Sequence, residues 1–157
     1  MEDNILGTLR EDERDKGVFH GSIAHGDRNI GLSLNPDGGP LPDCLALARS
    51  VVSELSTIDA KARHAAAQHL LKSYNENWRE YTEDDGNGGF VVVSNPEITE
   101  EQFMSTIMLS SVSIAGDSLD SSVSVAYDDG GMFCGHAIWV VSFDGVAFSD
   151  PDVSIVG

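Results

Sequence analysis

The nonapeptide DDGGMFCGH, residues 128–136, brings acid, glycine, thiol and imidazole groups together just before the apolar run AIWVV. Cys134 and His136 are two residues apart, so on a β-strand their side chains would share a face and could form a thiolate–imidazolium pair. With Asp128 or Asp129 to orient the imidazole, such a pair could serve a small hydrolase or transferase. Catalysis also needs oxyanion donors, and no motif in the sequence supplies them. We therefore favour a structural turn in which His136 bonds the backbone or Asp129.

The other histidines do not form a metal-binding pattern. His64 and His69 are five residues apart, which places them about 140° apart around a helix, so they would not share a metal ion. His20 and His25 flank an early turn, where solvated histidines are equally expected. No HExxH motif and no third ligand accompanies either pair. We predict no metal site.

The acidic segment EDDGNGG, residues 83–89, offers oxygen ligands at Glu83, Asp85 and Asn87, and Gly88 stands where a calcium-binding EF-hand loop turns. The twelfth position, which needs a bidentate glutamate, is Ser94. Because Asp, Asn and Gly are also the residues that form loops, we interpret the segment as a flexible acidic linker. Phosphate-binding loops, dinucleotide-binding glycine motifs and serine-hydrolase elbows are absent from the sequence, so no cofactor is predicted.

Charge is the strongest compositional signal, because 26 acidic and nine basic residues give a formal net charge of −17. No lysine or arginine follows Arg79, while 13 acids lie in residues 83–152. Such a segment repels phosphate groups, so nucleic-acid and anionic-membrane binding are disfavoured. The same segment could bind a basic protein partner. An acidic surface that serves only solubility, or adaptation to a saline cytoplasm, would produce the same composition. The carboxylates expected to form the partner-binding surface lie near predicted turns: Asp117, Asp120, Asp128, Asp129 and Asp144, with Asp150 nearby.

Periodicity and turn residues predict the elements of the first half. Short apolar clusters in residues 17–40 predict two or three strands, joined at residues 25–27 and closed by NPDGG. Apolar residues at spacings of three and four then predict a helix over 42–55 and a second helix over 59–81.

A third helix is marked by local spacing. Thr99 and Gln102 are placed as a capping box, and Ile98 and Phe103 as its hydrophobic staple. This pattern predicts a helix that begins directly after Thr99.

From Ser111 onward apolar residues recur at every second position, which predicts four strands. The Asp144-Gly145 dipeptide is placed as a two-residue hairpin before a last strand through Val146 and Phe148. Residues 128–131 separate an earlier pair of strands. One of two alternating sets in the AIWVV strand faces the core, either Ile138 and Val140 or Ala137, Trp139 and Val141.

Strands before, helices between and strands after predict an α+β fold, with about three helices packed on antiparallel sheet. A length of 157 residues suits a single domain over 1–157. The charged N-terminus and the absence of a long apolar run predict a soluble, cytoplasmic protein. Cys44 and Cys134 have no ligand-spaced partner and are predicted to be reduced thiols.

Three segments resemble a bacterial family known only as domain of unknown function 2262: EITEEQF, VSIAGDSLDSSVSVAYDDGGMFCGHAIWV and the closing VSIVG. The resemblance extends through LALARSVVSEL and the helix that ends in Trp78. It implies an α+β bacterial domain. The family has no agreed activity, so the resemblance transfers no catalytic residue.

Two functions of different classes are consistent with these features. The favoured one is a non-enzymatic acidic module that binds a basic protein, in its most concrete form an immunity-like protein that neutralises a basic toxin. The alternative is a small hydrolase or transferase that uses Cys134 and His136, with Asp128 or Asp129 as the orienting acid.

Overall fold

The computed structural model describes residues 1–116 and 120–157, so the expected partner-binding residue Asp117 lies outside the described residues. The helices are α1 (Leu41–Ser53), α2 (Leu55–Ser73) and α3 (Glu100–Thr106), with short helical turns at Tyr74–Trp78 and Gly145–Ala147. The strands are β1 (Glu2–Asp3), β2 (Gly7–Thr8), β3 (Arg10–Glu11), β4 (Phe19–His25), β5 (Arg28–Asn35), β6 (Glu80–Asp84), β7 (Phe90–Ser94), β8 (Met108–Gly116), β9 (Ser121–Asp128), β10 (Ala137–Ser142) and β11 (Asp152–Val156).

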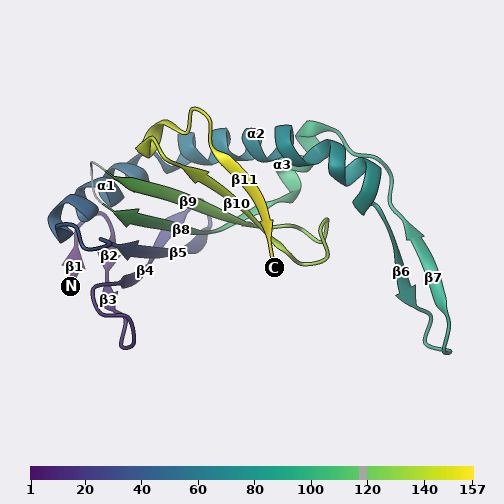
Figure 1. The fold of residues 1–157 in the computed structure, drawn as a ribbon, viewed down its shortest axis with the longest axis horizontal. Helices are drawn as coiled ribbons and strands as arrows, with labels where there is room; N and C mark the ends of the chain where they lie inside the picture. Colours follow the sequence, from purple (N-terminus) through teal and green to yellow (C-terminus); the bar gives the residue numbers. More distant parts are fainter. Residues whose placement is uncertain (117–119) are drawn as a thin grey trace.

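Seven strands form the main sheet in the order β11-β10-β9-β8-β5-β4-β3. Neighbouring strands are antiparallel except β5 and β8, which run parallel. The three helices and the β6–β7 hairpin lie between these two strands in the chain and form the long crossover connection that a parallel pair requires. N-terminal and C-terminal strands therefore share one sheet (Figure 1). The predicted α+β class with mainly antiparallel pairing is confirmed.

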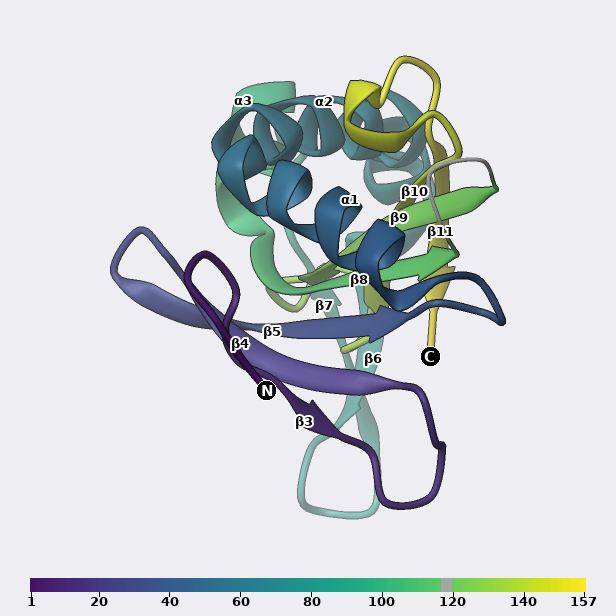
Figure 2. The ribbon, with the colours of Figure 1, turned by 90° about the vertical axis from the view of Figure 1, so that its left-hand side faces the viewer.

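The helices cover one face of this sheet, as Figure 2 shows. The hydrophobic core lies between the helices and the inward side chains of the central strands. On β10 the inward side chains are Ile138 and Val140, each 0% exposed, whereas Trp139 points to the other face and is 42% exposed. The alternative in which Ala137, Trp139 and Val141 line the core is wrong, because the helices pack on the opposite face of β10.

The predicted helices are present with shifted ends. α1 and α2 are separated by Glu54 alone, so the second helix begins four residues before the predicted start at Asp59. The capping box is confirmed: Thr99 Oγ1 accepts from the Gln102 N–H at 3.2 Å, and Gln102 Oε1 accepts from the Thr99 N–H at 2.8 Å. In the described part of the chain, no helix is both long and apolar enough to cross a membrane.

The end of the second helix and the acidic linker were predicted wrongly. α2 passes into a π-helical turn at Tyr74–Trp78, and the chain then forms a separate two-stranded hairpin from β6 and β7. The β-branched run of β7 favours a strand, and the glycine-rich segment before it allows the chain to fold back onto β6. Asp85 closes this turn, because its Oδ1 atom accepts from the N–H groups of Asn87 and Gly89.

The connection between β10 and β11 also differs from the prediction. Residues 144–145 do not form a two-residue hairpin, and the strand predicted through Val146 and Phe148 is absent. A 3-10 turn at Gly145–Ala147 instead leads to Phe148, whose side chain is buried and whose φ is 46°. The burial of Phe148 holds this segment against the core, so the edge strand forms later, as β11.

Candidate functional site

The loop that connects β9 to β10 is organised around a buried carboxylate. Asp129 is 3% exposed and accepts hydrogen bonds from the backbone N–H groups of Gly131 (2.9 Å), Phe133 (2.7 Å) and Gly135 (2.9 Å). These donors stabilise the carboxylate by charge-assisted hydrogen bonds. The expectation that Asp129 belongs to a solvated acidic surface is wrong, because the loop closes around its side chain.

Cys134 and His136 lie in this loop and not on a strand, so the shared face assumed for a catalytic pair does not exist. Cys134 is exposed and has a left-handed φ of 58°. His136 Nδ1 lies 2.6 Å from the carbonyl oxygen of Phe133, and the imidazole packs edge-on against Trp78. His136 is therefore held by the backbone, as the structural interpretation predicts.

Phe133 fastens the loop to the helical layer. Its fully buried ring makes edge-to-face contacts with Tyr74 at 5.9 Å, Trp78 at 5.3 Å and Phe103 at 6.3 Å between ring centroids. Aromatic pairs of this geometry contribute beyond their buried area. The stretch that is richest in chemical groups is thus a connection between β9 and β10 that packs against the π-helical turn after α2 and against α3.

The remaining acidic residues are divided between the two ends of the sheet. Asp120 directly precedes β9 and Asp128 ends it, so roughly 25 Å of strand separates them at about 3.3 Å per residue. Asp144 follows β10, and the pairing of Ser142 with Val123 places it at the same end as Asp120. The structure therefore brings Asp120 and Asp144 together and leaves Asp128 apart.

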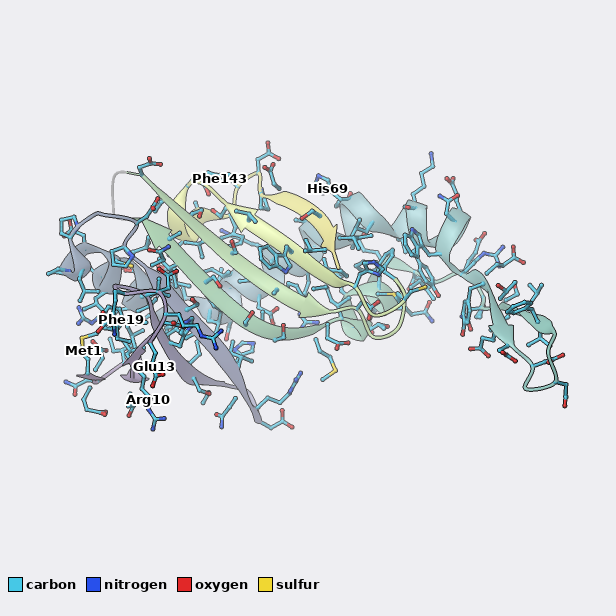
Figure 3. All side chains as sticks on the ribbon, turned by 60° about the horizontal axis from the view of Figure 1, so that its bottom comes forward. Met1, Arg10, Glu13, Phe19, His69 and Phe143 are labelled. Carbon is cyan, nitrogen blue, oxygen red and sulfur yellow. The ribbon has the colours of Figure 1, made fainter. Side chains whose placement is uncertain are left out.

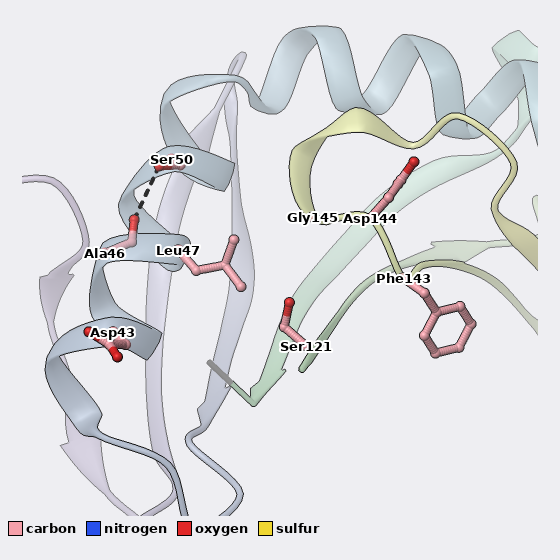
Figure 4. A pocket seen from close by; sticks show the side chains of 8 residues that line it. All are labelled: Asp43, Ala46, Leu47, Ser50, Ser121, Phe143, Asp144 and Gly145. Atoms are coloured by element: carbon pink, nitrogen blue, oxygen red, sulfur yellow. Dashed lines mark hydrogen bonds between the residues drawn. The ribbon is translucent and has the colours of Figure 1, made fainter. Parts of the chain in front are cut away.

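Two hollows open at the Asp120 end of the sheet. The larger, of about 560 Å³, lies between α1 and the end of β10 (Figure 4) and is lined by Asp43, Leu47, Ser50, Ser121, Phe143 and Asp144. The smaller, of about 140 Å³, shares Ser121 and Phe143 with it and adds Asp37 and Asp120. We call the surface formed by Asp37, Asp43, Asp120, Phe143 and Asp144 the acidic end.

Hydrogen bonds hold the carboxylate of Asp144 in its ionised form. Its Oδ1 atom accepts from the Ser142 hydroxyl at 2.7 Å, and its Oδ2 atom accepts from the Ser149 N–H at 3.4 Å. These bonds, chiefly that of Ser142, lower the pKa of Asp144 below its usual value. Asp144 therefore presents a fixed negative charge at the rim of the larger hollow.

Phe143 adds an apolar group to this charged surface. Its side chain is 68% exposed and lies at the end of the sheet away from the β6–β7 hairpin (Figure 3). Phe143 continues the every-second-residue spacing of Trp139 and Val141, and this spacing by itself does not show that the side chain is exposed. Only the position of the helical layer shows that Phe143, like Trp139, lies on the face of the sheet that points away from the core.

Residues 3–147 match the model of a family of uncharacterised proteins conserved in bacteria, DUF2262. The chain belongs to the DUF2262 family. No curated protein and no solved structure matches it. The matched segment contains the β9–β10 loop and every member of the acidic end.

This DUF2262 chain also contains a polar network that the sequence did not reveal. Asp59 on α2 accepts hydrogen bonds from Arg63 Nε at 2.9 Å and from the Tyr127 hydroxyl at 2.7 Å, and its Oδ2 atom lies 3.2 Å from His25 Nε2. Arg63 also donates two bonds of 2.6 Å to the carbonyl oxygens of Met104 and Ile107. The network joins α2 to β9, to the β4–β5 hairpin and to the end of α3. Its role is therefore structural.

The four other histidines of the DUF2262 chain have local partners. His20 lies 3.2 Å from Asp12, His25 contacts Asp59, His64 lies 2.8 Å from Glu100, and His69 lies 2.8 Å from the carbonyl oxygen of Ala65. Across residues 1–116 and 120–157, no three His, Cys, Asp or Glu side chains are grouped closely enough to hold a metal ion.

Proposed function

We propose that this DUF2262 protein is a non-enzymatic binding domain whose acidic end recruits a basic protein. The observation that carries the proposal is the combination of two carboxylates, Asp43 and Asp144, with the exposed ring of Phe143 around one hollow. Carboxylates by themselves would serve solubility. An exposed aromatic group beside a hollow is instead typical of the anchors that supply affinity in protein interfaces.

The carboxylates of the acidic end also favour a basic protein as the partner. Asp37, Asp43, Asp120 and Asp144 are all exposed, and they line two adjoining hollows. Fields from carboxylates gathered in this way add, and they steer an oppositely charged partner during encounter. A lysine- or arginine-rich protein would therefore associate faster than a neutral one, and salt would slow the association.

An immunity-like role is the most concrete form of this proposal. A small acidic protein in the bacterial cytoplasm could neutralise a basic toxin by covering its cationic surface. The acidic end would guide the encounter, and Phe143 would fill a pocket on the toxin and slow dissociation.

The test is a pull-down from the source bacterium, followed by surface plasmon resonance with the captured basic protein. Wild-type protein is compared with an Asp43→Asn/Asp144→Asn variant and with Phe143→Ala. We expect the double variant to lower the association rate by about tenfold at low salt, because steering of this kind changes rates by ten to a thousandfold. Phe143→Ala should mainly raise the dissociation rate.

The matched control is Asp27→Asn/Asp128→Asn, which removes the same charge from the opposite end of the sheet. It should leave the association rate close to that of the wild type. Equal losses in the two double variants would show that only net charge matters. Capture that is insensitive to both salt and Phe143→Ala would also contradict the proposal.

A further inference from the structure

The β6–β7 hairpin projects from the body of the protein as an arm (Figure 1). Its base is fixed by two hydrogen bonds between Arg79 and Asn95: the Asn95 N–H donates to the Arg79 carbonyl oxygen at 2.8 Å, and Arg79 Nη1 donates to the Asn95 carbonyl oxygen at 3.1 Å. Asn75 adds a reciprocal pair of 3.0 Å bonds to the backbone of Ile98. The arm is therefore held in a defined direction at its base.

The arm displays apolar side chains that nothing in the described chain covers. Phe90 is 76% exposed, Val92 72% and Val91 47%, although such side chains favour burial. A two-stranded hairpin is at best marginally stable in water unless it packs against another element or gains a strand. The arm thus has the properties of a β-hairpin that pairs with a strand of another chain.

The two edges of the arm differ in charge. β6 carries Glu80, Glu83 and Asp84, whereas β7 (FVVVS) carries no charged residue. Charged side chains on an edge strand oppose further pairing, and an uncharged apolar edge permits it. The β7 edge is consequently the one that can accept another strand.

The hydrogen-bond pattern shows which backbone groups face outward on that edge. Bonds between Arg79 and Asn95, and between Asp85 and Gly89, close the ladder at its two ends. Hydrogen-bonded and non-hydrogen-bonded pairs alternate along an antiparallel ladder. The N–H and C=O groups of Phe90, Val92 and Ser94 therefore point away from β6.

We propose that the added strand is β7 of a second copy of this chain, paired antiparallel about Val92. In this register Val92 faces its own counterpart and Phe90 faces Ser94 of the second copy, so the outward backbone groups satisfy one another around a twofold axis. Two chains of charge −17 repel each other over most of their surfaces. Pairing through the uncharged β7 strands places both acidic β6 strands at the outer edges of a four-stranded sheet, where their separation is greatest.

Sedimentation velocity of the full chain over a range of concentrations tests this dimer. Val92→Lys would place two lysines opposite each other at the twofold axis, so we expect its dimer dissociation constant to be at least about tenfold higher than that of the wild type. Thr82→Lys is the matched control, because Thr82 is the cross-strand partner of Val92 and the charge change is the same. It should dimerise as well as the wild type, and circular dichroism should show that both variants are folded.

Disulfide trapping tests the register independently. In a Cys134→Ser background, Val92→Cys should form an intermolecular disulfide under oxidised glutathione, because directly paired residues lie about 5.5 Å apart between Cα atoms. Thr82→Cys should not. A chain that sediments as a monomer at every concentration overturns the proposal, and so does a dimer that Val92→Lys leaves intact. Because the arm and the acidic end lie at opposite ends of the molecule, either proposal can fail without the other.

Discussion

The hydroxyl group of Tyr127 donates a 2.7 Å hydrogen bond to the carboxylate of Asp59, a residue 68 positions earlier in the chain. Burial raises the pKa of Tyr127 far above its usual value, and the nearby Asp59 raises it further, so the hydroxyl remains a donor at all ordinary pH values. Arg63 completes the arrangement, because its guanidinium lies 5.2 Å from the centre of the Tyr127 ring. The central strand β9 is thereby attached to α2.

Tyr127→Phe should lower the free energy of unfolding by about 0.5 to 1.5 kcal/mol, because Asp59 loses one donor while its other partners remain. Urea denaturation followed by circular dichroism measures this change. Tyr81→Phe removes the hydroxyl of an exposed tyrosine on the arm, whose bonds to Glu83 and Asn95 lie at the surface, so this control should have a smaller effect. Equal stability of the two variants would mean that the Tyr127 bond adds nothing to the fold.

Asp129→Asn should destabilise the protein by about 1.5 to 3 kcal/mol, the usual contribution of hydrogen bonds to a charged group. An amide supplies one acceptor oxygen where three N–H groups converge, and its NH2 group finds donors instead of acceptors. Asp128→Asn removes the same charge from an exposed neighbour, and it should change stability by less than about 0.5 kcal/mol. Thermal and chemical denaturation should agree on the order of the two variants.

Ile138→Ala should cost about 2 to 5 kcal/mol, because it leaves a cavity between β10 and the helices. Trp139→Ala removes more atoms from the adjacent position on the open face of the sheet, yet it should cost less than Ile138→Ala. Guanidinium denaturation of both variants compares the two faces directly. A larger loss for Trp139→Ala than for Ile138→Ala would contradict this, because it would mean that the open face of β10 is packed more tightly than the face covered by the helices.

The contribution of Asp3 to stability should depend on pH. The guanidinium of Arg49, with N–H groups of Leu6 and Ile5, lowers the pKa of Asp3 from 3.8 to about 2. A depressed pKa in the folded state stabilises the protein above the unfolded pKa, and this stabilisation is lost as the pH falls toward 2. The difference in unfolding free energy between wild type and Asp3→Asn should be constant above about pH 5 and shrink between about pH 4 and 2. In an Arg49→Gln background most of this pH dependence should disappear.

Cys134 should react with thiol reagents as an ordinary exposed cysteine, and Cys44, which is buried, should react only after unfolding. Because His136 is bonded to the Phe133 carbonyl oxygen, His136→Gln should not change the labelling rate of Cys134. Labelling with an Ellman-type reagent at several pH values measures both rates. A native rate well above that of model thiols, lost in His136→Gln, would instead support the catalytic pair.

Features that depend on neighbouring residues were predicted from the sequence. The capping box at Thr99 and Gln102 is confirmed, because both of its hydrogen bonds join residues three apart. The alternation of side chains along β10 left two possible sets of core residues, and the buried set contains Ile138 and Val140. The excess of acidic residues after Arg79 can be counted from the sequence without a structure.

Features that depend on contacts between distant segments were decided by the tertiary structure. Which face of β10 is buried depends on where α1 and α2 pack, so Trp139 is exposed although it lies in an apolar run. The apolar run of β7 was not predicted to form an exposed arm, because exposure is set by what the rest of the chain leaves uncovered.

The aspartates illustrate the same difference. Sequence proximity to a turn placed Asp128, Asp129 and Asp144 in one group, yet only folding determines the environment of each carboxylate. Asp129 is buried because three backbone N–H groups of its own loop converge on it, and Asp128 and Asp144 are separated because β9 and β10 run antiparallel. Composition determined that the protein is acidic, and strand order determined where that charge is concentrated, because pairing between distant segments brings Asp43 and Asp144 to one hollow.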